Sequence, residues 1–190
     1  MRIGCVILAG GKSKRMKQDK AFLLYQGKSF IEQIQTQCQF FEEKILSRND
    51  SLLKDDEWII ISDQYQEIGP MGGIYSVLSC CQSDALFVIA CDTPYITTSL
   101  IQKICHQYQG EDILICRDDN GKIHPLCGIY HKRILPLLEK HIQKEHYRLM
   151  KMIEQTNYQI MTLNHEDSIQ LQNINTPEDY QKIKTNFESR

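Results

Sequence analysis

Residues 3–20 of this chain read IGCVILAGGKSKRMKQDK, an apolar run that opens into a short basic loop containing two glycines. The run from Ile3 to Leu8 has the length and composition of a buried strand. Gly10 and Gly11 let the backbone approach a ligand closely, so that successive N–H groups form an anion-binding nest. Four side chains concentrate positive charge on the same loop and suit a triphosphate: Lys12, Lys14, Arg15 and Lys20.

A tight turn with solvated basic side chains is the alternative interpretation of this loop. Its position favours binding, because it follows the first strand, and α/β sheets bind ligands beyond the carboxyl ends of their strands. The tripeptide Gly11-Lys12-Ser13 imitates the end of a Walker P-loop. That motif requires another glycine five residues before its second glycine, where this chain has Val6. The spacing therefore excludes a P-loop kinase or NTPase.

Short apolar runs alternate with segments of helical spacing along the rest of the chain. We expect strands at 3–8, 58–62, 86–90, 113–116 and 126–130, and helices at 30–41, 72–81, 99–108 and 133–141. This alternation predicts a mostly parallel sheet covered by helices on both faces. Asn120-Gly121 predicts an antiparallel hairpin, and Gly27-Lys28 predicts a smaller reversal. The N-cap Thr176 and the acidic residues after Pro177 predict a last helix from Pro177 to about Phe187.

Composition limits what the chain binds. The balance of 22 basic against 24 acidic residues gives a net charge of −2, so no global charge draws it to nucleic acid or to an anionic membrane. The 190 residues can bury one substantial core and suit a single domain. No apolar run has the length of a signal-peptide core or a membrane span, and we expect a cytoplasmic protein. The 8 cysteines show no Cys-x-x-Cys spacing, and we expect reduced thiols without a catalytic role.

Two aspartates emerge directly from predicted strands. Asp92 follows the run 86–90, and one carboxylate suffices for magnesium, which takes further ligands from substrate phosphates and water. Asp63 follows the run 58–62, where a carboxylate can accept hydrogen bonds from guanine N1–H and its 2-amine, or bind a ribose hydroxyl. The alternatives are a local Asp-Thr-Pro turn for Asp92 and a helix cap or solvated loop residue for Asp63.

These motifs together resemble the molybdenum cofactor guanylyltransferase family of nucleotidyltransferases. The resemblance begins with Leu8-Ala9-Gly10-Gly11, Arg15-Met16 and Asp19-Lys20, although Lys17 stands where the family has glycine and Ala90 where it often has proline. It implies a single three-layer, Rossmann-like α/β nucleotidyltransferase domain over residues 1–190, with a mostly parallel sheet and some antiparallel pairing. The N-terminal part is implied to bind the nucleotide and the C-terminal part the acceptor. The implied nucleotide contacts are Leu8, Ala9, Gly10, Gly11, Lys20, Asn49, Asp63, Gly69 and Asp92, with close backbone approach at Gly72 as well.

Later segments resemble the family's acceptor side. His124-Pro125-Leu126-Cys127-Gly128-Ile129-Tyr130 is similar to a His-Pro-Leu-x-Gly-Leu-Tyr strand, which implies that His124 and Gly128 lie beside the pterin acceptor. Asn173-Ile174-Asn175-Thr176-Pro177 matches an Asn-x-Asn-Thr-Pro motif that implies Asn175 near the metal and phosphates. Alternate residues of an extended segment face one side, so both amides can reach one site. Arg148 and Lys151 suit the acceptor phosphate. Structural or solvated roles are the alternatives for all of these residues.

The implied reaction transfers GMP from GTP to the terminal phosphate of molybdopterin and releases pyrophosphate. The acceptor phosphate is an anion at neutral pH, so catalysis rests on positioning and charge neutralisation. Asp92 is the implied Mg²⁺ ligand, while Arg15 and Lys20 withdraw charge from the α-phosphate and the departing pyrophosphate. GTP and molybdopterin are the implied substrates, and transient contacts with other molybdenum cofactor proteins are implied as well.

Two other functions are compatible with part of the pattern. A cytidylyltransferase acting on molybdopterin, or on a sugar or alcohol phosphate, shares the loop and the metal aspartate. Such relatives more often carry Leu-Ala-Ala-Gly and generally lack the His-Pro-Leu segment. A non-catalytic nucleotide-binding module is the second alternative, and loss of Asp92 or Lys20 would have favoured it, but both are present.

Overall fold

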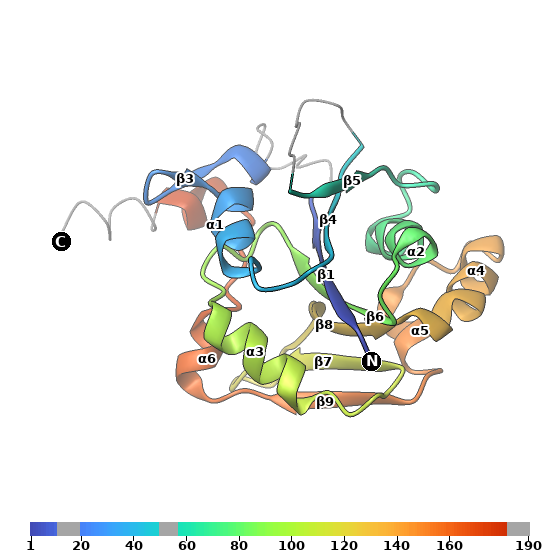
Figure 1. The fold of residues 1–190 in the computed structure, drawn as a ribbon. Helices are drawn as coiled ribbons and strands as arrows, with labels where there is room; N and C mark the ends of the chain where they lie inside the picture. The colour runs from blue at the N-terminus through green and yellow to red at the C-terminus, as the bar shows by residue number, and fades with distance from the viewer. Residues whose placement is uncertain (11–19, 50–56, 182–190) are drawn as a thin grey trace.

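The computed structural model describes residues 1–10, 20–49 and 57–181, and its main sheet has 7 strands in the order β5-β4-β1-β6-β8-β7-β9 (Figure 1). The strands are β1 Ile3–Leu8, β4 Lys44–Ser47, β5 Ile59–Ile61, β6 Ala85–Ala90, β7 Ile113–Arg117, β8 Ile123–His131 and β9 Tyr158–Thr162, and the small hairpin is β2 Leu24–Tyr25 with β3 Lys28–Ser29. The helices are α1 Phe30–Gln37, α2 Pro70–Cys80, α3 Thr98–Gln107, α4 Leu135–Gln143, α5 Leu149–Ile153 and α6 His165–Ile169, with 3-10 turns η1 Lys20–Phe22 and η2 Lys132–Ile134.

One half of the sheet is parallel, and its strands end at the same level. β1 pairs in parallel with β4 and β6, and β4 pairs in parallel with β5. Leu8 lies opposite Ser47 on one side and Ala90 on the other, and Ser47 lies opposite Ile61. The carboxyl ends of four strands therefore form one straight edge, where α/β sheets place their ligands.

The other half contains the antiparallel pairing that Asn120-Gly121 predicts. β8 runs antiparallel to both β6 and β7, and β7 pairs in parallel with β9. Gly121 has a φ of 83°, the left-handed conformation that a tight turn requires and glycine adopts without strain. The predicted class, a mostly parallel sheet with some antiparallel pairing, is confirmed.

Helices cover both faces of the sheet, so the molecule has three layers (Figure 1). On one face, apolar side chains of α1 and α3, including Ile34 and Leu100, pack against the sheet residues Cys5 and Phe87. On the opposite face, α2, α4 and α5 pack against Val6 and other sheet residues. Successive apolar side chains of β1 therefore belong to two separate hydrophobic cores, one on each face of the sheet.

Several element boundaries differ from the sequence prediction. The helix predicted at 30–41 ends at Gln37, and the chain turns so that the Phe41 ring stacks at 6.1 Å on Phe87. The helix predicted at 133–141 begins as η2, and α4 starts where Pro136 occupies the first turn. The small reversal at Gly27 is confirmed as the turn between β2 and β3, and the last helix begins at Pro177, with residues beyond 181 outside the described range.

The structure also describes the state of the cysteines and the length and character of the helices. All 8 cysteines are free, as expected, and three of those in strands, Cys5, Cys116 and Cys127, are buried. A hydrogen bond with Cys116 and burial both raise the pKa of the Cys127 thiol well above its usual range. None of the helices in the described part of the chain has the length and apolar character needed to cross a membrane.

Candidate active site

The candidate site lies on the aligned edge of the parallel strands. Gly10 follows β1, Asn49 follows β4, Asp63 follows β5 and Asp92 follows β6. The register brings these four segments out of the sheet next to one another, because each strand ends opposite the end of its neighbour. Residues that lie far apart in the sequence thus share one edge.

Asp92 is the centre of a polar cluster at the end of β6. The Lys20 ammonium nitrogen lies 3.6 Å from Asp92 Oδ2, and the two side chains are 15% and 17% exposed. Lys20 Nζ also donates to Asn175 Oδ1 at 2.5 Å, and Asn173 Nδ2 donates to Asp92 Oδ1 at 3.2 Å. The expectation that both asparagines of the Asn-x-Asn segment reach one site is confirmed.

The segment that carries these asparagines is held in place by its own backbone and by an apolar contact. The Ile174 N–H donates to the Asp92 carbonyl oxygen at 2.9 Å, and the Ile174 side chain is buried with Leu23 and Phe30. Thr176 caps the following helix, since its Oγ1 accepts from the Asp179 N–H at 3.1 Å. The alternating amides on either side of Ile174 therefore face Asp92 and Lys20.

Lys20 is positioned by a contact that the sequence did not reveal. Lys20 begins η1, and the Phe22 ring of the same turn lies 4.6 Å below the guanidinium carbon of Arg48. Arg48 is 2% exposed at the end of β4. This cation–π contact fixes η1 against the sheet edge. The sequence predicted a role for Asn49 but none for the neighbouring Arg48, because a charged residue after a strand carries no sequence signal of burial.

Asp63 forms the second polar cluster of the edge. Ser47 Oγ donates to Asp63 Oδ1 at 3.0 Å, and Asn49 Nδ2 donates to Oδ2 at 3.3 Å. The Asp63 N–H in turn donates to Asn49 Oδ1 at 2.7 Å. A Cβ added at Gly10 would lie 3.3 Å from Asp63 Oδ2, so the loop glycine passes directly beside this carboxylate. Leu8, Ala9, Gly10, Asn49 and Asp63 are thus brought together as expected.

Glycine is required at the two positions before and within α2 for different structural reasons. Gly69 is the N-cap of α2 with φ 73° and ψ −157°, a conformation that is essentially restricted to glycine. A Cβ at Gly72 would lie 2.4 Å from the Tyr65 carbonyl oxygen. The close approach that the structure shows at Gly72 is therefore to the loop before α2.

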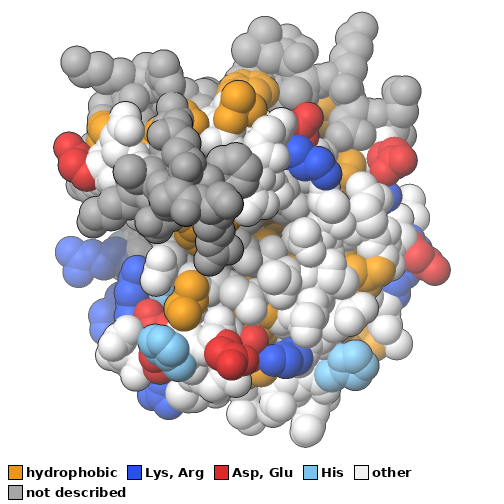
Figure 2. Space-filling view, turned by 90° about the vertical axis from the view of Figure 1, so that its left-hand side faces the viewer, with side chains coloured by type: hydrophobic (Ala, Val, Ile, Leu, Met, Phe, Trp, Pro, Cys, Tyr) orange, Lys and Arg blue, Asp and Glu red, His pale blue; other side chains and the backbone are white. Residues whose placement is uncertain are grey.

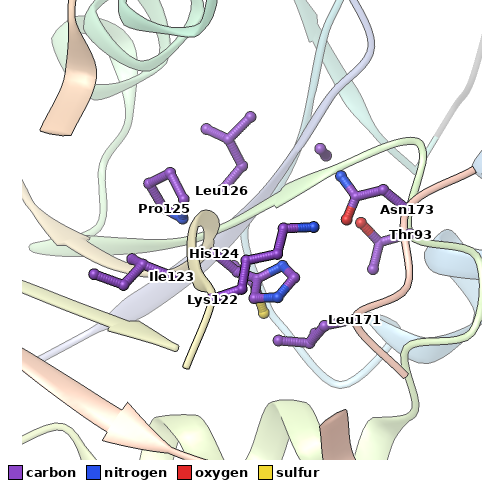
Figure 3. Close-up of a pocket in the computed structure, with 10 residues that line it drawn as sticks. Thr93, Lys122, Ile123, His124, Pro125, Leu126, Leu171 and Asn173 are labelled. Atoms are coloured by element: carbon purple, nitrogen blue, oxygen red, sulfur yellow. The ribbon is translucent and has the colours of Figure 1, made fainter. Parts of the chain in front are cut away.

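A cavity of about 230 Å³ lies next to the Asp92 cluster (Figure 3). The strand end of β6, the start of β8 and the segment before the last helix surround it. Its lining residues are Ala90, Thr93, Lys122, Ile123, His124, Pro125, Leu126, Cys127, Leu171 and Asn173. Because Asn173 both lines the cavity and contacts Asp92, the cavity and the strand-end cluster share a wall.

His124 lines this cavity, and one of its ring nitrogens is already engaged. Its Nε2 lies 2.9 Å from Asp118 Oδ2, and the imidazole is buried. The His124 hydrogen bond is the main cause that lowers the pKa of the Asp118 carboxyl. A second smaller pocket of about 120 Å³ continues beyond His124 along the hairpin. His124 thus has a structural role, because it ties the start of β8 to the hairpin turn through Asp118.

The floor of the cavity is a bulge in β8. Ile115 lies opposite Gly128 while the next β7 residue, Cys116, lies opposite His124, so residues 125–127 lack β7 partners. The buried Tyr130 hydroxyl donates to the Pro125 carbonyl oxygen and holds the bulge. Gly128 itself is buried in the strand, and a Cβ there would lie 2.1 Å from the Leu114 carbonyl oxygen. Glycine at position 128 thus permits the close approach of β7, and Gly128 does not belong to the residues that line the cavity.

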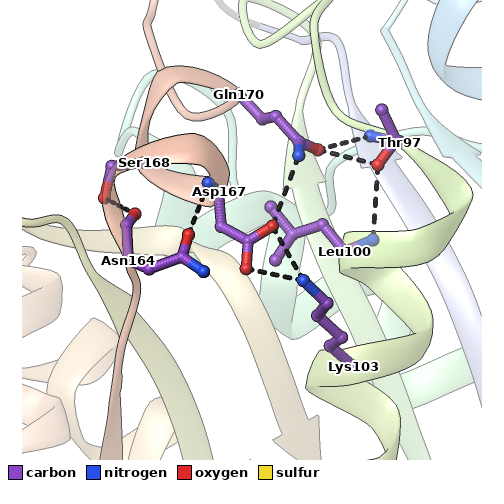
Figure 4. A network of polar contacts seen from close by, with 7 residues as sticks. All are labelled: Thr97, Leu100, Lys103, Asn164, Asp167, Ser168 and Gln170. Atoms are coloured by element: carbon purple, nitrogen blue, oxygen red, sulfur yellow. Dashed lines mark hydrogen bonds and ion pairs between the residues drawn. The ribbon is translucent and has the colours of Figure 1, made fainter.

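The segment from Leu171 to Asn175 is also anchored through α6 (Figure 4). Lys103 of α3 pairs with Asp167 of α6 at 2.9 Å. Gln170 Oε1 accepts from the Thr97 N–H at 3.1 Å and from its hydroxyl at 2.8 Å. These contacts bind α6 to α3 and thereby fix one wall of the cavity.

Other predicted residues are not brought to this site. Arg148 is exposed at the N-cap of α5, where its carbonyl accepts from the Lys151 N–H, and neither residue lines the cavity. The prediction that Arg148 binds the acceptor is therefore not supported by its position. The predictions for Gly11 and Arg15 lie outside the described residues.

On the face shown in Figure 2, basic and acidic side chains are interspersed. Within residues 1–10, 20–49 and 57–181, no group of three or more His, Cys, Asp or Glu side chains is arranged to hold a metal ion. A single carboxylate such as Asp92 still fits magnesium, which takes few protein ligands when phosphate oxygens and water complete its shell.

Comparison with known proteins identifies the class to which this fold and strand-edge site belong as the nucleotidyltransferases. The family model of the MobA-like NTP transferase domain matches residues 5–160, and the chain belongs to this family. It is 36% identical over 153 residues to a probable molybdenum cofactor guanylyltransferase of Geobacillus sp. (strain WCH70), covering 76% of this chain and 77% of that protein.

A second relative and a solved structure are also similar to this chain. A probable molybdenum cofactor guanylyltransferase of Flavobacterium johnsoniae is 34% identical over 147 residues, covering 75% of this chain and 76% of that protein. The fold is similar to the crystal structure of molybdopterin-guanine dinucleotide biosynthesis protein A from Archaeoglobus fulgidus. That similarity has a TM-score of 0.84 with 22% identity and covers 100% of both chains.

Proposed function

We propose that this protein transfers GMP from GTP to the terminal phosphate of molybdopterin, forming the guanine dinucleotide cofactor and pyrophosphate. The observation that carries the proposal is the aligned strand edge, which places Asp63 at one end and the Asp92–Lys20 pair at the other. A nucleotide laid along this edge has its base near Asp63 and its phosphates near Lys20. The acceptor in this proposal is inferred from the names of the relatives.

Asp63 supports guanine as the base. A carboxylate offers about four lone-pair sites, and side-chain donors from Ser47 and Asn49 occupy two of them. The remaining sites suit the adjacent N1–H and 2-amine donors of guanine. Cytosine presents one amine beside the acceptor atoms N3 and O2, so it matches a carboxylate less well. The hydrogen bonds from Ser47 and Asn49 hold the carboxylate in one orientation before the base arrives.

Lys20 and Asp92 support transfer at the α-phosphate. We propose that Asp92 holds Mg²⁺, which when bound supplies charge neutralisation at the phosphates. Lys20 places its ammonium group at the phosphates, and Asn175 orients that ammonium through its side-chain oxygen. Asn173 fixes the Asp92 carboxylate through Oδ1 and leaves Oδ2 directed toward Lys20. The acceptor phosphate is already ionised at neutral pH, so no side chain has to remove a proton from it.

The cavity beside Asp92 supports the position of the acceptor. Its apolar walls suit the flat ring system of a pterin, and the wall at Asn173 is shared with the strand-end cluster. In this proposal one half of the single domain binds the nucleotide and the other half binds the acceptor. We further propose that it acts in the cytoplasm and meets other molybdenum cofactor proteins transiently.

Calorimetric binding of GTP and CTP in the presence of Mg²⁺ tests the base assignment, and a transfer assay with molybdopterin tests the acceptor. We expect tighter binding of GTP and formation of the guanine dinucleotide. Equal or CTP-favouring affinity would overturn guanylyl transfer and favour a cytidylyltransferase. Nucleotide binding without transfer to molybdopterin would favour a different acceptor or a non-catalytic module.

A further inference from the structure

The cavity next to Asp92 contains one cationic side chain whose role is not explained by the fold. Among the described residues that line it, Lys122 is the one lysine or arginine, and none is a carboxylate. In Figure 3 the Lys122 side chain extends across the cavity, and its terminal nitrogen points toward the side formed by Asn173 and Thr93. That side is the wall shared with the Asp92 cluster.

The backbone of Lys122 is fixed, so this direction is built into the hairpin. The Lys122 N–H donates to Asp118 Oδ1 at 2.9 Å, and the Lys122 carbonyl oxygen accepts from the Asp118 N–H at 2.9 Å. Asp118 also bonds His124 through its other oxygen. The Asp118 carboxylate therefore holds the hairpin turn, the backbone of Lys122 and the ring of His124.

The surroundings of the Lys122 ammonium favour an anion. No ion pair joins Lys122 to a carboxylate in the described part of the chain, whereas Lys20 and Lys103 each have an aspartate partner. Lys122 is exposed at the cavity, and an ammonium group without a carboxylate partner there can form a charge-assisted hydrogen bond with an anionic ligand. The cavity thus combines apolar walls with one anion-binding group near the reaction centre.

We propose that Lys122 binds the terminal phosphate of the acceptor and directs it toward the α-phosphate of the nucleotide. This inference rests on the proposed function, because it assigns a residue to the nucleophile of that reaction. The sequence prediction gave the acceptor phosphate to Arg148 and Lys151, which do not line the cavity. The available signal was the position of Lys122 between the hairpin turn and His124, since residues two apart on a strand share a face.

The test compares Lys122→Met, Lys122→Arg and a control, Lys140→Met, in steady-state transfer from GTP to molybdopterin. Lys140 is exposed on α4, and it does not line the cavity. We expect Lys122→Met to raise the KM for molybdopterin about 10-fold or more and to leave the KM for GTP nearly unchanged. We expect Lys122→Arg to recover most of the loss and Lys140→Met to match the wild type.

The outcomes separate this inference from the proposed function. A wild-type protein that makes no guanine dinucleotide would overturn both. If the wild type is active and Lys122→Met keeps the wild-type KM for molybdopterin, the inference alone is wrong. Equal increases in the two KM values would also overturn it, because they would assign Lys122 to the nucleotide. Thermal unfolding of each variant separates loss of binding from loss of fold.

Discussion

The two halves of the sheet build their parts of the site in different ways. In the parallel half, β5, β4, β1 and β6 end at one level, and a candidate site residue lies two positions beyond the end of each strand. In the half with β8 and β7, an antiparallel hairpin, a bulge and a distant C-terminal segment together enclose a cavity. A regular strand edge thus fixes the nucleotide side, while irregular structure shapes the acceptor side.

The largest expected effect comes from removing the charge at the end of β6. Asp92→Asn keeps the size of the side chain, and we expect it to lower the transfer rate about 10³-fold or more, because the phosphates lose their metal ligand. Asp84→Asn is the matched control, since Asp84 is exposed just before the start of the same strand. Turnover assays with purified, folded protein measure both. A near-normal rate for Asp92→Asn would remove Asp92 from the mechanism.

A glycine in the acceptor half is expected to affect stability. Gly128→Ala places a methyl group 2.1 Å from the Leu114 carbonyl oxygen, and we expect it to lower the free energy of unfolding by about 3 kcal/mol. Gly27→Ala meets no atom within 4 Å but keeps a φ of 79°, and we expect it to cost about 1 kcal/mol. Chemical denaturation gives both values. A stable Gly128→Ala protein with weakened acceptor binding would instead restore the ligand-contact role.

A smaller effect is expected at the base end of the parallel edge. Asp63→Asn removes the carboxylate that faces the guanine donors, and we expect kcat/KM for GTP to fall about 10- to 100-fold with the KM for molybdopterin unchanged. Inosine triphosphate, which lacks the 2-amine, provides the comparison. Asp63→Asn should lower kcat/KM for inosine triphosphate less than it lowers kcat/KM for GTP. Equal losses with both nucleotides would place Asp63 at the ribose or in a structural role.

The smallest effect concerns the hairpin at acid pH. The hydrogen bond from His124 keeps the pKa of Asp118 below its usual value, so the stabilisation is complete above the ordinary carboxyl pKa of about 4. It is lost as the pH falls through the lower, folded-state pKa. We expect the Tm of the wild type to decline more steeply on acidification than that of Asp118→Asn. Parallel slopes between about pH 6 and pH 3 would show that this contact does not contribute.

The sequence predicted the parallel half well because its signals are local. Asp63 and Asp92 each follow an apolar run, and the register then aligns them without further information. Short or edge strands were missed: β4 has four residues and starts with Lys44, and β9 lies at the edge of the sheet with no fully buried position. β4 is too short to show a period, although three of its residues are buried, and β9 shows no apolar pattern because it buries few side chains.

The acceptor half was predicted less completely because its contacts are tertiary. The His-Pro-Leu segment indicated the right region, yet Gly128 packs against β7, and Arg148 caps α5 away from the cavity lining. Lys122 reaches the cavity because Asp118 fixes the hairpin, and the sequence does not show that hydrogen bond. Residues whose roles depend on a bulge or a fixed turn are identified from the structure.

The most direct test of the central claim follows the phosphorus atoms of GTP. GTP labelled with radioactive phosphorus at the α position, or separately at the γ position, is incubated with the protein, Mg²⁺ and molybdopterin. Guanylyl transfer predicts that the α label appears in the pterin dinucleotide and the γ label in pyrophosphate. If the γ label were transferred to molybdopterin, or if neither label reached it while GTP was bound, the proposed function would be contradicted.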